Sequence, residues 1–109
     1  MANRDVALAF VSAFCSGDVP GIEELLTHDF SLTGPLATFD SRDEYVSCLN
    51  SDPPVPVSYE IISVLDSPKC VSVYYNYLRK SVSITIAQLF WIQNEKISRT
   101  ILVFDRPRA

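Results

Sequence analysis

The spacing of hydrophobic residues predicts a helical first half of the chain and a second half made of strands. A first helix is expected to be capped by Asn3 and to end at Gly17, because glycine readily adopts the left-handed backbone of a helix C-terminus. Its apolar positions recur at helical spacing, at Val6, Phe10, Ala13 and Phe14.

The first residues of a second and a third helix are also recognisable. Asp18 is the predicted cap of the second helix, and Pro20 lies in its first turn. Ser41 and Glu44 form a capping box that predicts the start of the third helix. Between these helices, residues 30–33 alternate with period two and predict a short strand that ends at Gly34.

The second half of the chain has the composition of a β-sheet. Segments 59–65, 71–78, 82–92 and 97–104 are rich in Val, Ile, Tyr, Phe and Thr. Short turns separate them, which favours an antiparallel meander. Three N-terminal helices followed by a curved, mostly antiparallel sheet define an α+β fold, which we expect to form a single domain of residues 1–109.

Both faces of the predicted sheet carry apolar side chains. In segment 71–78, Val73 and Tyr75 lie on one face and Tyr74 lies on the other. A sheet with one solvated face alternates more clearly between apolar and polar residues, and three short helices can cover only one face. We therefore expect the second face to be buried in a homodimer.

Composition and charge exclude several kinds of partner. The chain is 48% hydrophobic and has a net charge of −4, which argues against nucleic acid because phosphates attract a basic surface. No apolar run approaches the ~18 residues that cross a bilayer. The N-terminus lacks the basic and then apolar pattern of a signal peptide, and Cys15, Cys48 and Cys70 are odd in number. Reduced thiols and a cytoplasmic location are expected.

Three common catalytic and cofactor motifs are missing from the sequence. There is no glycine-rich phosphate loop, no metal motif of paired cysteines and no Gly-x-Ser-x-Gly elbow. We expect no cofactor and no metal.

Several local motifs resemble one family in their order and spacing. They are Ser16-Gly17-Asp18-Val19-Pro20-Gly21-Ile22 followed by Leu25-Leu26, then His28-Asp29-Phe30-Ser31-Leu32, then Ser41-Arg42-Asp43-Glu44, and finally Lys96-Ile97 followed by Phe104. This series resembles the nuclear transport factor 2-like and ketosteroid-isomerase-like superfamily, which includes SnoaL-like proteins. The resemblance implies a cone-shaped half-barrel and dimerisation through the outer sheet face.

The resemblance also locates the positions where the isomerases carry their reacting groups. The tyrosine position falls on Phe10, the base position on Gly34 and the sheet acid on Ala87. None of these residues can stabilise an oxyanion through a hydroxyl or carry a proton. The chain is therefore not expected to perform ketosteroid isomerase chemistry.

By the same placement, the resemblance implies a ligand pocket inside the cone. The candidate lining residues are Phe10, Phe14, Leu32, Cys48, Ser72, Tyr74, Leu89, Thr100, Leu102 and Phe104. The hydroxyls of Ser72, Tyr74 and Thr100 would orient a ligand in this apolar space. The alternative is that these residues fill the interior as ordinary core.

Three functional hypotheses follow. The first is a small homodimeric protein that binds an apolar small molecule. The second is a cyclase-like or isomerase-like enzyme with a nonstandard acid such as Asp29 or Asp40, and the third is an interaction module without catalysis. His28, the only histidine, is interpreted as a structural residue at the end of the second helix, where the dipole favours a positive charge.

Overall fold

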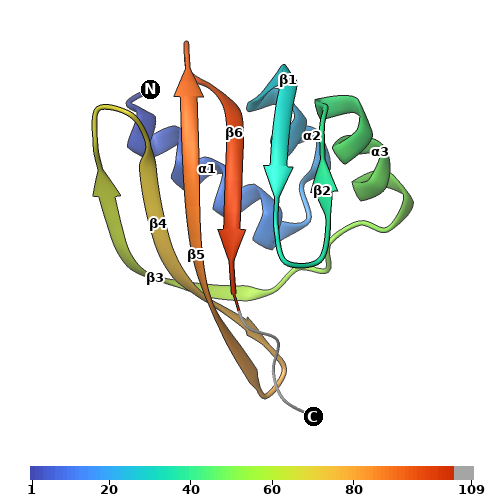
Figure 1. Ribbon diagram of the computed structural model, residues 1–109. Helices are drawn as coiled ribbons and strands as arrows, with labels where there is room; N and C mark the ends of the chain where they lie inside the picture. The colour runs from blue at the N-terminus through green and yellow to red at the C-terminus, as the bar shows by residue number, and fades with distance from the viewer. Residues whose placement is uncertain (105–109) are drawn as a thin grey trace.

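The computed structural model describes residues 1–104 and shows an α+β protein whose helices pack on a curved, unclosed sheet (Figure 1). The first half of the chain contains α1 (Asn3–Ser16), α2 (Val19–Glu24), β1 (Leu26–Thr33), β2 (Thr38–Phe39) and α3 (Arg42–Ser51). The second half contains β3 (Ser58–Asp66), β4 (Val71–Arg79), β5 (Val82–Gln93) and β6 (Lys96–Val103).

The junction between α1 and α2 depends on a glycine and an aspartate. Gly17 has φ 74°, and its amide donates to the carbonyls that end α1. A Cβ at this position would lie 2.8 Å from the carbonyl oxygen of Pro54, so both backbone conformation and space require glycine. Asp18 caps α2 by accepting a hydrogen bond from the Gly21 amide, as expected. The predicted cap of α1 is wrong, because Asn3 is already helical and Ala2 precedes it without a side-chain cap.

The sheet has the strand order β2-β1-β6-β5-β4-β3. Strands β3 to β6 form the predicted antiparallel meander. The sheet is nevertheless mixed, because β1 runs parallel to β6 and joins the first half of the chain to the last strand. This β1 begins at Leu26, four residues before the predicted strand, and the two-residue strand β2 was not anticipated.

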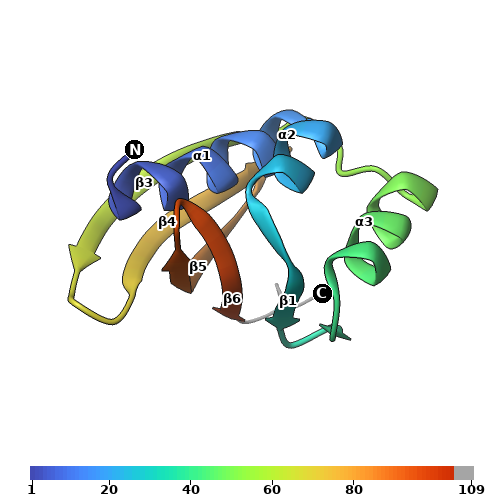
Figure 2. The ribbon, with the colours of Figure 1, turned by 90° about the horizontal axis from the view of Figure 1, so that it is seen from above.

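Register shifts accompany the curvature of the sheet. Pairing is irregular between Ile61 and Ser63, between Trp91 and Ile92, and between Leu26 and Ser31. Such irregularities bend a strand and increase its twist. Figure 2 shows the sheet curving around the side on which the helices lie.

The inner face of the sheet and the helices enclose the hydrophobic core. Phe10 of α1 meets Phe90 of β5 edge to face, with ring centroids 5.5 Å apart. Phe30 of β1 is fully buried and packs against Tyr45 of α3. Aromatic contacts thus link the helices to both halves of the sheet.

The outer face of the sheet is not covered by any element of residues 1–104. Alternation from the buried inner positions places these apolar side chains on it: Leu65, Tyr74, Ala87, Leu89, Trp91, Ile101 and Val103. We refer to these seven residues as the outer patch. Val103 is 61% exposed and Leu65 is 56% exposed, so the patch leaves large apolar side chains in water.

None of the helices formed by residues 1–104 has the length and apolar character required to cross a bilayer.

Candidate functional site

A cavity of about 350 Å³ lies between the helices and the inner face of the sheet. Helix α1, the β1–β2 turn, α3 and strands β4, β5 and β6 all contribute to its wall. The lining residues are Phe10, Phe14, Leu32, Gly34, Pro35, Leu36, Ala37, Tyr45, Tyr75, Tyr77, Ile84, Ile86, Gln88, Leu102 and Phe104. The site is therefore built almost entirely of apolar and aromatic side chains.

Aromatic rings form one side of the cavity. Phe10 and Phe14 are one helical turn apart on α1, and their rings are nearly parallel with centroids 6.4 Å apart. On the opposite side, Tyr45 packs between Phe30 and Phe39. Burial raises the pKa of Tyr45, so its phenol stays neutral at physiological pH.

A hydrogen-bonded series of side chains leads from the polar part of the wall, Tyr75 and Gln88, to Thr100 behind it. The Tyr75 hydroxyl donates to Gln88 Oε1 over 2.9 Å, and Gln88 Nε2 donates to Thr100 Oγ1 over 3.0 Å. The Thr100 hydroxyl in turn donates to the carbonyl oxygen of Leu89 over 2.8 Å. Gln88 and Thr100 are the fully buried polar residues of the described chain, and this series gives each of their side-chain oxygen and nitrogen atoms at least one partner.

The cavity has no formal charge within the described part of the chain. Its lining from residues 1–104 includes no carboxylate, imidazole, ammonium or guanidinium group. Burial is also the main cause of the raised pKa of Tyr75, which keeps this phenol protonated. The wall can therefore hold an apolar molecule and form neutral hydrogen bonds with it.

Five of the ten candidate pocket residues line this cavity: Phe10, Phe14, Leu32, Leu102 and Phe104. The other five do not. Ser72, Tyr74 and Leu89 lie on the outer face of the sheet, because each alternates with a buried inner residue. Cys48 is exposed on α3, and Thr100 is buried behind Gln88 rather than lining the cavity.

Ala87, on which local spacing placed the position of the sheet acid, does not line the cavity. Ala87 pairs with Tyr74 and Val103 and belongs to the outer patch. The neighbouring Gln88 points inward and lines the cavity. A shift of one residue along a strand exchanges the two faces of a sheet, so local spacing did not decide which of these two neighbours faces the cavity. Phe10 and Gly34, on which the resemblance placed the tyrosine and the base, both line the cavity.

The sequence contained a signal for some of the lining residues that were missed. Tyr75 and Tyr77 share the period-two alternation of β4 with the fully buried Val73. Ile84 and Ile86 share that of β5 with the fully buried Phe90. The alternation groups these residues correctly but does not say which face the helices cover. Nothing in the local pattern indicated the loop residues 35–37, whose place in the wall depends on the β1–β2 turn.

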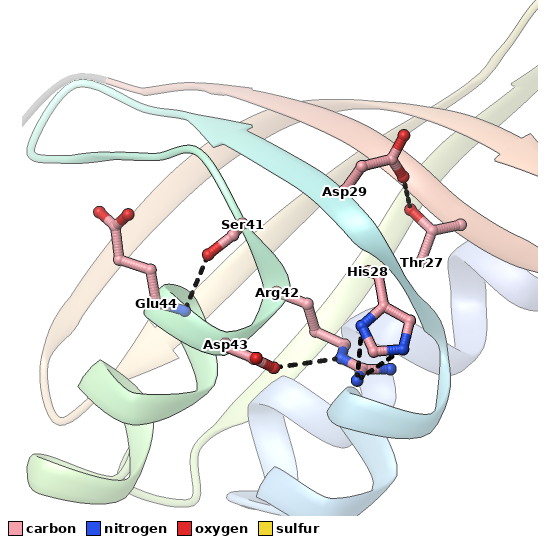
Figure 3. Close-up of polar contacts among 7 residues, drawn as sticks. All are labelled: Thr27, His28, Asp29, Ser41, Arg42, Asp43 and Glu44. Carbon is pink, nitrogen blue, oxygen red and sulfur yellow. Dashed lines mark hydrogen bonds and ion pairs between the residues drawn. The ribbon is translucent and has the colours of Figure 1, made fainter.

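His28 lies in β1 and not at the end of α2, so the helix-dipole interpretation is wrong. A guanidinium nitrogen of Arg42 lies 3.2 Å from His28 Nδ1, and Arg42 Nε lies 3.7 Å from an Asp43 oxygen (Figure 3). The side chain of Asp29 accepts a hydrogen bond from the Thr27 hydroxyl.

This polar cluster lies outside the cavity. None of the residues labelled in Figure 3 belongs to the lining, and the exposed Asp40 does not belong to it either. Ser41 caps α3 through the Glu44 amide, whereas Figure 3 shows the Glu44 carboxylate directed away from Ser41. Only one half of the predicted capping box is therefore formed.

Comparisons with known proteins give no match in sequence and many in structure. No family model matches the chain, and no curated protein matches it. An NTF2-like protein of unknown function from Cytophaga hutchinsonii ATCC 33406 superimposes with a TM-score of 0.80 and 18% identity, over 96% of this chain and 91% of that one.

Two further structures have the same arrangement. A putative ketosteroid isomerase from Kribbella flavida DSM 17836 matches with a TM-score of 0.82 and 14% identity, over 98% of this chain and 80% of that one. A hypothetical protein with a ketosteroid isomerase-like fold from Catenulispora acidiphila DSM 44928, in complex with trimethylamine, matches with a TM-score of 0.73 and 14% identity, over 91% and 84% of the two chains. The chain therefore has the nuclear transport factor 2-like and ketosteroid isomerase-like superfamily fold.

Proposed function

We propose that this protein is a small homodimeric pocket protein that binds a neutral, apolar small molecule in the cavity between its helices and its sheet. The observation that carries the proposal is the cavity itself. Its volume of about 350 Å³ falls within the usual range for small-molecule sites, and its lining is apolar with a few polar groups.

The absence of charge in the described lining favours a neutral ligand. An ion moved into such a site would lose its hydration without gaining a partner of opposite charge, which is strongly unfavourable. An apolar molecule gains from contact with Phe10, Phe14 and Phe104, all of which line the cavity. The structurally similar protein from Catenulispora acidiphila, in complex with trimethylamine, supports the idea that this fold accommodates small molecules.

The outer patch supports the homodimer. It combines large exposed side chains with half-buried ones on a face that no element of residues 1–104 covers. Contiguous apolar surface of this kind is typical of protein interfaces. A second copy of the same face offers the same apolar chemistry, and closed symmetric dimers are the commonest soluble assemblies.

A pair of neighbouring tryptophan substitutions tests the pocket. Leu102 lines the cavity, whereas Val103 points to the other face of the sheet. Leu102→Trp places an indole in the cavity, and Val103→Trp places the same group outside it. The readout is the fluorescence titration of N-phenyl-1-naphthylamine, a neutral dye that brightens in apolar sites.

We expect Leu102→Trp to weaken dye binding by about tenfold or more, because the added ring occupies the site and the lost contacts exceed ~1.4 kcal/mol. Val103→Trp should bind the dye like the unmodified protein. Equal binding by both variants would show that the dye does not enter this cavity. Circular dichroism confirms that both variants are folded.

A further inference from the structure

The hydrogen bonds behind the cavity wall fix which polar atoms can donate to a ligand. Thr100 is fully buried, and its Oγ1 lies 2.8 Å from the carbonyl oxygen of Leu89. A carbonyl oxygen can only accept, so the single hydroxyl proton of Thr100 is committed to that bond. The Thr100 oxygen can therefore only accept a hydrogen bond from Gln88.

This commitment determines the orientation of the Gln88 amide. The Gln88 atom 3.0 Å from Thr100 Oγ1 must donate and is therefore the nitrogen. The amide oxygen then faces Tyr75, whose hydroxyl lies 2.9 Å away and must donate to it. The reverse orientation would set the amide oxygen against the lone pairs of Thr100 and leave both atoms without a proton to share.

Once these hydrogen bonds are formed, one acceptor and one donor remain for a ligand. The Tyr75 oxygen has used its only proton and can offer nothing but lone pairs to a further group. The Gln88 nitrogen keeps a second N–H that has no acceptor within residues 1–104, although the residue is only 1% exposed. A buried donor without a partner is unfavourable, which points to an acceptor that occupies the cavity. Both side chains belong to the cavity wall.

We propose that Tyr75 and Gln88 form a subsite for the hydroxyl group of an otherwise apolar ligand, an alcohol or a phenol; this rests on the proposed function. A hydroxyl donates to the Tyr75 oxygen and accepts from the Gln88 N–H with one atom. An ether or a ketone can only accept and leaves the Tyr75 oxygen unused. A carboxylate or an ammonium group brings a charge that the described lining does not balance.

Three probes of similar shape test this subsite in the unmodified protein. They are naphthalene, 2-methoxynaphthalene and 2-naphthol, which is neutral at pH 7, and their dissociation constants are measured by ligand fluorescence. We expect 2-naphthol to bind about three- to tenfold more tightly than 2-methoxynaphthalene, the range that one net hydrogen bond supplies. Naphthalene has no polar group, so its dissociation constant measures the affinity of the apolar cavity alone.

A substitution behind the wall tests the cause of this preference. Thr100 does not line the cavity, so Thr100→Val should leave the naphthalene dissociation constant within about twofold. The variant removes the acceptor that orients Gln88, and the amide becomes free to turn its nitrogen toward Tyr75. The Tyr75 proton is then available to a ligand, and the preference for 2-naphthol should fall to about one. Thr100→Ser keeps the hydroxyl and should keep the preference.

The results separate this inference from the proposed function. If naphthalene binds but 2-methoxynaphthalene binds as tightly as 2-naphthol, the hydroxyl subsite is overturned and the apolar pocket stands. An unchanged preference in a folded Thr100→Val variant also overturns it. If none of the three probes binds, the proposed function fails and the subsite fails with it. If Thr100→Val does not fold, the preference of the unmodified protein for 2-naphthol over 2-methoxynaphthalene still tests the hydroxyl subsite.

Discussion

The guanidinium carbon of Arg99 lies 4.7 Å from the centre of the Trp91 ring, and the two residues are direct partners in the β5–β6 pairing. A cation over an indole face at this distance contributes about 0.5–1 kcal/mol. The contact holds the indole within the outer patch. Trp91 is the only tryptophan of the chain, so its fluorescence reports on this face.

The first prediction concerns the oligomeric state. Val103→Lys should dissociate the homodimer, because an ammonium group buried in an apolar interface loses its hydration. Sedimentation should show a dimer at micromolar concentration for the unmodified protein and a monomer for the variant. The Trp91 emission should shift to longer wavelength when the interface opens.

Val55→Lys is the matched control for this variant. Val55 is 58% exposed, close to the 61% of Val103, but it lies in the loop between α3 and β3. The Val55→Lys variant should leave the dimer intact. A stable monomer of the unmodified protein at micromolar concentration would contradict the homodimer directly.

The second prediction concerns Gly17. Gly17→Ala should lower the free energy of unfolding by about 2 kcal/mol or more, because alanine is disfavoured in the left-handed region and its Cβ would meet the Pro54 carbonyl. Urea denaturation measures the change. Gly34→Ala provides the comparison, since a Cβ there has neighbours at 3.7 Å or more. A similar loss in both variants would argue against a specific role of the Gly17 conformation.

The third prediction concerns alkaline pH. Burial raises the pKa of the Cys15 thiol from 9.0 to about 11, and burial likewise raises the pKa of Tyr75 above its ordinary value of 10.0. The unfolded chain therefore releases these protons at lower pH than the folded chain. The stability that the neutral groups provide is complete below pH 9 and is lost as the pH rises toward the folded pKa values.

Urea denaturation at a series of pH values checks this dependence. The free energy of unfolding should begin to fall above pH 9, and Cys15→Ala should reduce the slope between pH 9 and 10 relative to the unmodified protein. Cys48→Ala is the control, because Cys48 is exposed. An identical slope for Cys15→Ala would show that this thiol has the same pKa in both states.

The local sequence determined most elements of this protein. Gly17, Asp18 and Ser41 act where they were predicted, because a left-handed terminus and a capping side chain depend on residues within one turn of each other. The four strands of the meander were also predicted to within one residue at each end. Their composition and their short turns are local properties as well.

Only the tertiary structure decided which face of each strand became the cavity wall. Tyr74 and Tyr75 are adjacent in sequence and chemically alike, yet Tyr75 lines the cavity and Tyr74 lies in the outer patch. Period-two alternation separates the two residues but does not say which side the helices will cover. That choice depends on where α1 and α3 pack and on the parallel pairing of β1 with β6, contacts between segments far apart in the chain. The sequence by itself therefore determined the elements and their order, and long-range packing selected the residues that can meet a ligand.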